Sequence, residues 1–201
     1  MKKRLYVDFH VLQTVPPSCI NRDDTGSPKT AIYGGVTRAR VSSQAWKHAM
    51  RQAFVEESLL DEEDVGKRTK KVTELVEKEI AALAPEKDAA KLAKEVVKNT
   101  GLKVNEKKDE KKLKTLIFLS KAQVSALAEL GIEGCTEAQK YKDALGAAPS
   151  VDMVLFGRMV AEAASLNYDA AAQVAHSIST HAVQNEYDYF TAVDDCPDSD
   201  N

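Results

Sequence analysis

The residues best suited to chemistry lie in one stretch, where Arg38 and Arg40 are followed by the serine pair Ser42 and Ser43. In an extended segment alternate side chains point to the same face, so we expect the two arginines to lie side by side. The serines are typical helix N-caps, and a helix N-terminus offers free N–H groups and a positive dipole end that favour phosphate. The pattern predicts a phosphate contact. The alternative is an ordinary solvated arginine pair beside a capped helix.

The helix that follows the serines presents a second row of polar side chains. Gln44, Lys47 and Arg51 recur at i, i+3 and i+7, which places an amide and two cations along one edge. Beside them an apolar stripe at helical spacing predicts the face that packs on the rest of the protein, and it comprises Ala45, Trp46, Ala49, Met50, Ala53 and Phe54. The polar edge suits a string of phosphates.

Charge is segregated along the 201 residues. Residues 1–51 carry nine lysines and arginines against three aspartates, a net +6, although the whole chain has a net charge of −3. The remainder is therefore net −9. Such segregation indicates a local surface for a polyanion on a protein that stays soluble. Scattering of the basic residues over several faces is the alternative that composition leaves open.

We find no motif of a known catalytic site, such as a nucleophile elbow, a phosphate-binding loop of the Walker type or a metal-binding helix. The acidic pair Asp23 and Asp24 could hold a magnesium ion for RNA cleavage, or could pair with Arg22 or cap a turn. For these two aspartates we favour pairing with Arg22 or turn capping over magnesium binding. We expect structural roles for the four histidines. Three separated cysteines predict neither disulfides nor zinc and indicate a reducing cytoplasm. We therefore expect no catalytic residue, metal or cofactor.

The order of elements predicts an α+β fold. Residues 5–11 alternate like a half-buried strand, 16–35 form a long polar loop, and a helix follows from the serine pair. Residues 56–149 have the lysine- and glutamate-rich character of a helical insertion, and strands are expected at 151–156 and 172–183. This is the front of a ferredoxin-like, RRM-like domain, with its last helix and strand missing. No apolar run reaches the roughly 18 residues that a membrane span needs.

Several blocks of sequence resemble one family. They are the stretch from Phe9 to Arg51, with Pro17 to Asp24, Ala31 to Gly35 and Arg38 to Gln44 within it, and then Gly157 to Met159, Val174 to His181 and Phe190 to Asp195. Together they resemble the CasC family, the backbone subunit of type I-E CRISPR Cascade, with the helical insertion matched only in position and character. The resemblance implies a hand-shaped subunit with an RRM-like palm at 1–55 and 150–195 and helical fingers at 56–149. Residues 196–201 would begin a thumb or a disordered tail.

The resemblance also implies partners and a site. Copies would stack head to tail along a guide crRNA and present its bases to target DNA, together with other Cascade subunits and away from any membrane. The implied contacts with guide phosphates and sugars are Arg22, Lys29, Arg38, Arg40, Ser42, Gln44, Lys47 and Arg51. Met159 matches the methionine beside a flipped-out base.

Family members are considerably longer, and we expect the thumb and the rest of the palm to be absent from this chain. Two other functions stay open at this point. One is a metal-dependent ribonuclease that uses Asp23 or Asp24, as backbone subunits of other CRISPR types do. The other is a structural adaptor built on the helical insertion.

Overall fold

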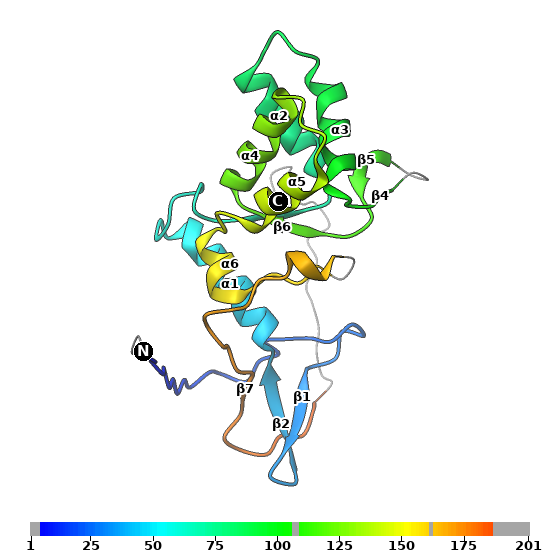
Figure 1. Cartoon of the computed structure of the whole chain (residues 1–201). Coiled ribbons are helices and arrows are strands. Elements are labelled where there is room, and N and C mark those ends of the chain that lie inside the picture. Colours follow the sequence, from blue (N-terminus) through cyan, green and yellow to red (C-terminus); the bar gives the residue numbers. More distant parts are fainter. Residues whose placement is uncertain (1–4, 106–108, 161–162, 187–201) are drawn as a thin grey trace, which may run out of the picture. The chain divides into compact units, whose positions relative to one another are not determined.

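The computed structural model describes residues 5–105, 109–160 and 163–186. They form two compact units (Figure 1), one of residues 1–45 and 175–201 and one of residues 46–174. The first is built on strands and the second mainly on helices, so the predicted α+β class is confirmed. None of the described helices is long and apolar enough to cross a membrane.

The first unit contains a three-stranded antiparallel sheet in the order β1–β2–β7. Its strands are β1 (Thr30–Tyr33), β2 (Val36–Val41) and β7 (Ser177–Ile178). Gly34 and Gly35 join β1 to β2 with φ angles of 66° and 77°. Positive φ at both central residues is what a tight hairpin requires, and glycine adopts it without steric cost. The hairpin register, with Arg38 opposite Ala31, follows from that turn.

Helix α1 (Ser43–Glu56) starts in the first unit and continues into the second. Ser42 caps it, because its Oγ accepts a hydrogen bond of 3.2 Å from the amide of Ala45. The predicted helix start is therefore confirmed. No residue of α1 is fully buried, so the apolar stripe packs less completely than its pattern indicates.

The second unit is a cluster of helices with two small β-pairs. Its helices are α2 (Val72–Leu83), α3 (Ala89–Thr100), α4 (Lys121–Ile132), α5 (Ala138–Gly146), α6 (Val151–Phe156) and the 3-10 turn η1 (Ala164–Leu166). Strand β3 (Lys67–Thr69) pairs with β6 (Ile117–Leu119), and β4 (Val104–Asn105) pairs with β5 (Asp109–Leu113). The helices predicted between residues 56 and 149 are present, whereas the β3–β6 pair within that range was not predicted.

The core of the second unit comes from the helical stripes. Val76 and Ile80 of α2, Val96 of α3, Leu127 of α4 and Leu145 of α5 all belong to one buried cluster. Figure 1 shows α2, α3 and α4 side by side, in agreement with their contacts. Because α2, α3, α4 and α5 each bury only one stripe, none of their charged residues is buried.

Three strand predictions need correction. Residues 5–11 form no strand, and their apolar side chains are exposed, Leu5 by 89% and Phe9 by 87%. Alternation fixes which side chains share a face, but a strand also needs a neighbour for its N–H and C=O groups, and no described residue pairs with this segment.

Residues 151–156 form helix α6 instead of the predicted strand, because a short apolar run has no periodicity that separates helix from strand.

The strand predicted at 172–183 is reduced to Ser177–Ile178. The chain still runs along β2 beyond that point, since the amides of Ser179 and Val183 donate to the carbonyls of Ala39 and Thr37. The Ser179 Oγ meanwhile accepts from the amide of Ala39, so a side chain takes the place of a backbone acceptor and interrupts the regular ladder.

Candidate nucleic-acid interface

The β1–β2 hairpin places Arg38 and Arg40 two positions apart on β2, so both project from the same face of that strand, as predicted. The Arg38 Nε donates to the carbonyl of Tyr33 at 3.0 Å, and its Nη1 donates to the carbonyl of Ser179 at 2.9 Å. Its guanidinium also lies 5.9 Å from the centre of the Tyr33 ring. The Arg38 side chain is thus held in a fixed orientation by one carbonyl at the end of β1 and one just after β7.

Arg40 differs from Arg38 in having an unsatisfied donor. Its Nε is buried and has no hydrogen-bond partner among the described residues. Most buried polar atoms are paired, and an unpaired one is costly. Arg40 therefore keeps one donor that no described residue satisfies.

Arg22 and Lys29 flank a tight turn beside the same sheet. The amide of Lys29 donates to the carbonyl of Asn21, and the carbonyl of Lys29 accepts from the amide of Arg40. The Arg22 Nη1 donates to the carbonyl of Gly26 at 2.7 Å. The residues predicted on the loop are therefore brought next to β2, within the first unit.

Asp23 closes that turn. Its Oδ1 accepts hydrogen bonds from the amide of Thr25 (2.9 Å), the hydroxyl of Thr25 (2.7 Å) and the amide of Ser27 (3.0 Å). The hydroxyl of Thr25, followed by those amides, lowers the pKa of the exposed Asp23 carboxyl. This is the turn-capping role that we favoured for the acidic pair over a metal site. Across the described part of the chain, no three His, Cys, Asp or Glu side chains group as metal ligands would.

The front of α1 is less open than its sequence indicates. The amide of Ser42 donates to Oδ1 of Asn21 at 3.0 Å, and the amide of Ser43 donates to Nδ1 of His176 at 2.8 Å. The Ser42 side chain is buried, and its hydroxyl caps α1. The nearby Gln44 is exposed. Protein acceptors thus occupy two of the N–H groups expected to face phosphate. His176 has a structural role here, as we expected of the histidines.

Lys47 and Arg51 lie in the second unit, so their convergence with Arg38 and Arg40 stays a prediction. The Arg51 side chain is partly buried, and its Nε lies 3.2 Å from Oδ2 of the fully buried Asp152. Its guanidinium stacks 4.8 Å from the Phe118 ring centre and 5.0 Å from that of Phe156. No local pattern predicts this clamp of Arg51 by Asp152, Phe118 and Phe156, because these partners are far from Arg51 along the chain.

Asp152 has two further partners that complete the clamp. Its Oδ1 accepts from the amide of Gly66 at 2.9 Å and from the hydroxyl of Ser150 at 2.6 Å. A buried carboxylate is tolerated only when it is paired and hydrogen-bonded in this way. The clamp thus ties α1 to α6 and to the segment before β3.

Met159 projects from a well-anchored segment. Its side chain is 83% exposed, although Arg158 and Val160 on either side are 5% and 3% exposed. The Arg158 guanidinium donates to the carbonyls of Leu166 and Leu145, both at 2.8 Å. Its Nη1 also donates to the carbonyl of Phe118 and to Oε1 of Gln123, and burial lowers the pKa of the guanidinium. A buried arginine thus fixes the backbone from which an apolar side chain points into solvent.

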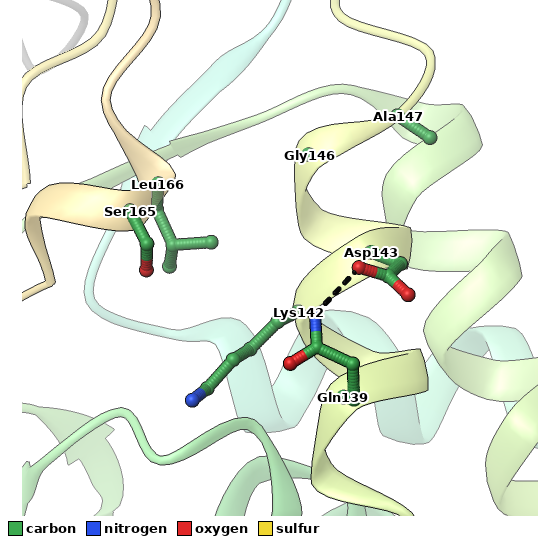
Figure 2. A pocket seen from close by; sticks show the side chains of 7 residues that line it. All are labelled: Gln139, Lys142, Asp143, Gly146, Ala147, Ser165 and Leu166. Carbon is green, nitrogen blue, oxygen red and sulfur yellow. Dashed lines mark hydrogen bonds between the residues drawn. The ribbon is translucent and has the colours of Figure 1, made fainter.

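A pocket of about 510 Å³ in the second unit has α5 on one side and η1 on the other (Figure 2). Within its wall Gln139 Nε2 donates to Oδ1 of Asp143 at 2.8 Å, and Lys142 is the cation among its lining residues. A lysine offset by an aspartate gives this pocket no strong preference for an anion.

Comparison with solved structures finds similar chains. A chain of a solved structure titled "CRISPR RNA-guided surveillance complex" is 31% identical with a TM-score of 0.67, and the match covers 85% of this chain and 57% of that one. A second, titled "CRISPR RNA-guided surveillance complex, pre-nicking", is 32% identical with a TM-score of 0.66, covering 92% and 55%. This chain thus spans little more than half the length of either structure's chain.

A search of curated proteins gave no match. The family model described as CT1975-like protein matches residues 7–201, almost the entire sequence. The chain therefore belongs to the family of CT1975-like proteins.

Proposed function

We propose that this protein is the backbone subunit of a CRISPR RNA-guided surveillance complex and binds the sugar–phosphate backbone of a guide crRNA. The single observation that carries the proposal is the pair Arg38 and Arg40 on one face of β2, with no acceptor for the Arg40 Nε among the described residues. Similarity to chains of two solved surveillance complexes supports the same role.

Binding rests on phosphate contacts and so carries no base preference. The first unit contributes Arg22, Lys29, Arg38, Arg40 and Gln44, and the second contributes Lys47, Arg51 and Met159. Ser42, which is buried, contributes only by capping α1. Copies of the chain stack head to tail along the guide, as in type I-E Cascade, and leave its bases open for target DNA. The subunit works in the cytoplasm and has no catalytic activity of its own.

The exposed Met159 supports a wedge role within this proposal. An apolar side chain held by a rigid segment can enter a stack of bases, with the cost of unstacking offset by new contacts. The anchoring of Arg158 supplies that rigidity.

The test is whether the purified full chain carries small RNA and protects it from nuclease digestion. We expect protected RNA of mixed sequence, lost on replacing Arg38 and Arg40 together with alanine. Unchanged protection by the double variant would place the RNA elsewhere. Fragments produced from complementary RNA in the presence of magnesium, and abolished by Asp24→Ala, would instead make the subunit a ribonuclease.

A further inference from the structure

Met159 lies in a stretch of chain that is paired with residues further along the sequence. The amide of Arg158 donates to the carbonyl of Tyr168 at 3.0 Å, and the amide of Tyr168 donates to the carbonyl of Arg158 at 2.8 Å. These two hydrogen bonds form an antiparallel bridge within the second unit. Arg158 and Val160 are buried, whereas Met159 between them is exposed. The bridge therefore fixes the backbone on one side of an exposed apolar side chain.

The backbone on the other side of Met159 is held by the side chain of Asn167. The amide of Val160 donates to Oδ1 of Asn167 at 2.7 Å, at the short end of the range for such bonds. Because a backbone N–H only donates, its partner is the oxygen of the Asn167 amide group and not the nitrogen. The Val160 N–H belongs to the peptide group that joins Met159 to Val160. Asn167 thus fixes the peptide group directly after Met159.

Both peptide groups around Met159 are therefore held. The Arg158 carbonyl, bonded to Tyr168, belongs to the peptide group before Met159, and the Val160 amide belongs to the one after it. Since peptide groups are planar, the only backbone freedom of Met159 is rotation about φ and ψ between these two planes. With both planes held, the direction in which the Met159 side chain leaves the backbone is set.

A backbone acceptor would serve Val160 if the antiparallel pairing continued. The next hydrogen-bonded pair after Arg158 and Tyr168 would join Val160 to Leu166. However, Leu166 is the last residue of η1, and its carbonyl accepts from Nε of Arg158 at 2.8 Å. Asn167 follows this turn, and its side chain takes the place of that acceptor. The hold on the peptide group after Met159 thus depends on one side chain and is open to a single substitution.

We infer that Asn167 is a positioning residue for Met159, and this inference rests on the guide-binding role proposed above. Asn167 acts through the Met159–Val160 peptide group and makes no contact with RNA itself. A side chain whose direction is already set loses less conformational entropy when it enters a stack of bases, so more of the binding energy goes into displacing the base. Removal of the Asn167 oxygen should therefore weaken base displacement and leave phosphate binding intact.

Fluorescence of 2-aminopurine in a bound RNA tests this role. The probes are single-stranded RNAs of one mixed sequence, each with one 2-aminopurine at a different position, bound to the full chain at saturating protein concentration. The position with the highest fluorescence marks the flipped base. Asn167→Ala should lower the ratio of flipped to stacked base there about two- to tenfold, as expected for the loss of one hydrogen bond. RNA affinity should be unchanged, because the phosphate contacts are made by other residues.

Two further variants separate positioning from a general effect on the fold. Asn167→Asp keeps an oxygen for the Val160 amide and should restore the fluorescence of the original protein. Ser165→Ala removes an exposed hydroxyl from the adjacent turn η1 and should have no effect. Relaxation of the Met159 methyl group by NMR gives a readout without RNA, and its mobility should rise in Asn167→Ala only. Unchanged fluorescence in Asn167→Ala, or equal losses in Asn167→Ala and Asn167→Asp, would overturn the inference.

Met159→Ala shows whether a failure belongs to this inference or to the proposed function. Loss of the signal in Met159→Ala but not in Asn167→Ala would remove the role of Asn167 and leave the wedge role of Met159. An unchanged signal in Met159→Ala, or no RNA binding by the original protein, would overturn the wedge role and this inference with it. Loss in both variants, with recovery in Asn167→Asp, is the expected result.

Discussion

The Nε of Arg51 lies 3.2 Å from Oδ2 of Asp152, a carboxylate with no exposure to solvent. Replacing Arg51 with alanine leaves that buried charge without its cation, which should cost about 3–5 kcal/mol of unfolding free energy. Chemical denaturation of the full chain measures the loss. The double variant Arg51→Met/Asp152→Asn removes both charges and should recover much of it. A single variant as stable as the original protein would show that the pair contributes nothing to stability.

Arg38 and Arg40 should behave differently on substitution. Arg40→Ala removes no hydrogen bond to a described residue through Nε, so we expect RNA binding to weaken with little change in stability. Arg38→Ala should lower both RNA affinity and the stability of the fold, because two hydrogen bonds to backbone carbonyls are lost. Each lost phosphate contact should reduce the slope of log K against log salt by about 0.7 for a single strand. Filter binding at several salt concentrations, with a melting curve for each variant, measures both effects.

Equal destabilisation by the two variants would mean that Arg40 also has a structural role. RNA binding that does not depend on salt would argue against phosphate contacts altogether.

Met159→Ala should leave stability within about 0.5 kcal/mol of the original, because the side chain is largely exposed. If the methionine holds a base flipped out of the stack, a guide with 2-aminopurine at that position should lose fluorescence when Met159 is replaced. Val160→Ala is the control: it is buried and should destabilise the chain by about 0.5–1.5 kcal/mol or more. Unchanged fluorescence with Met159→Ala would contradict the wedge.

Asp23 gives a prediction for pH. Its folded pKa is lowered by the hydroxyl of Thr25 and the amides around it, so the ionised carboxylate favours the turn. The turn should therefore be intact above the pKa of an unfolded aspartate and be lost as the pH falls through the lower folded value. The amide chemical shifts of Thr25 and Ser27 report this transition in an NMR titration. Asp23→Asn should weaken the pH dependence, whereas Asp24→Asn should preserve it.

Local features of the site could be predicted from the sequence. The alternation of Arg38 and Arg40 and the cap at Ser42 depend only on neighbouring residues, and both are present. The failed predictions depend on partners elsewhere. Residues 5–11 have the pattern of a strand but no described neighbour, and 151–156 form a helix whose Asp152 meets Arg51 across 101 positions.

The buried cation Arg158 illustrates a second limit. Arginine is normally exposed, so nothing in its local sequence indicates that backbone carbonyls of Leu145 and Leu166 enclose it. Another pocket of the second unit is similar, because its lining residues Thr73, Lys98 and Lys114 meet only once α2, α3 and the β4–β5 hairpin have packed. Sites of this kind depend on tertiary packing and are invisible to periodicity.

The pairing of β2 with the segment around β7 also has a consequence for synthesis on the ribosome. Arg38 donates to the carbonyl of Ser179, 141 positions later, and the helical unit is encoded between them. At a translation rate of about 5–20 residues per second, β2 waits roughly 7–30 s for this partner. Helices that rely on nearby contacts can form in that interval. A nascent chain stalled before residue 177 would therefore expose one edge of β2 to chaperones or to other nascent chains.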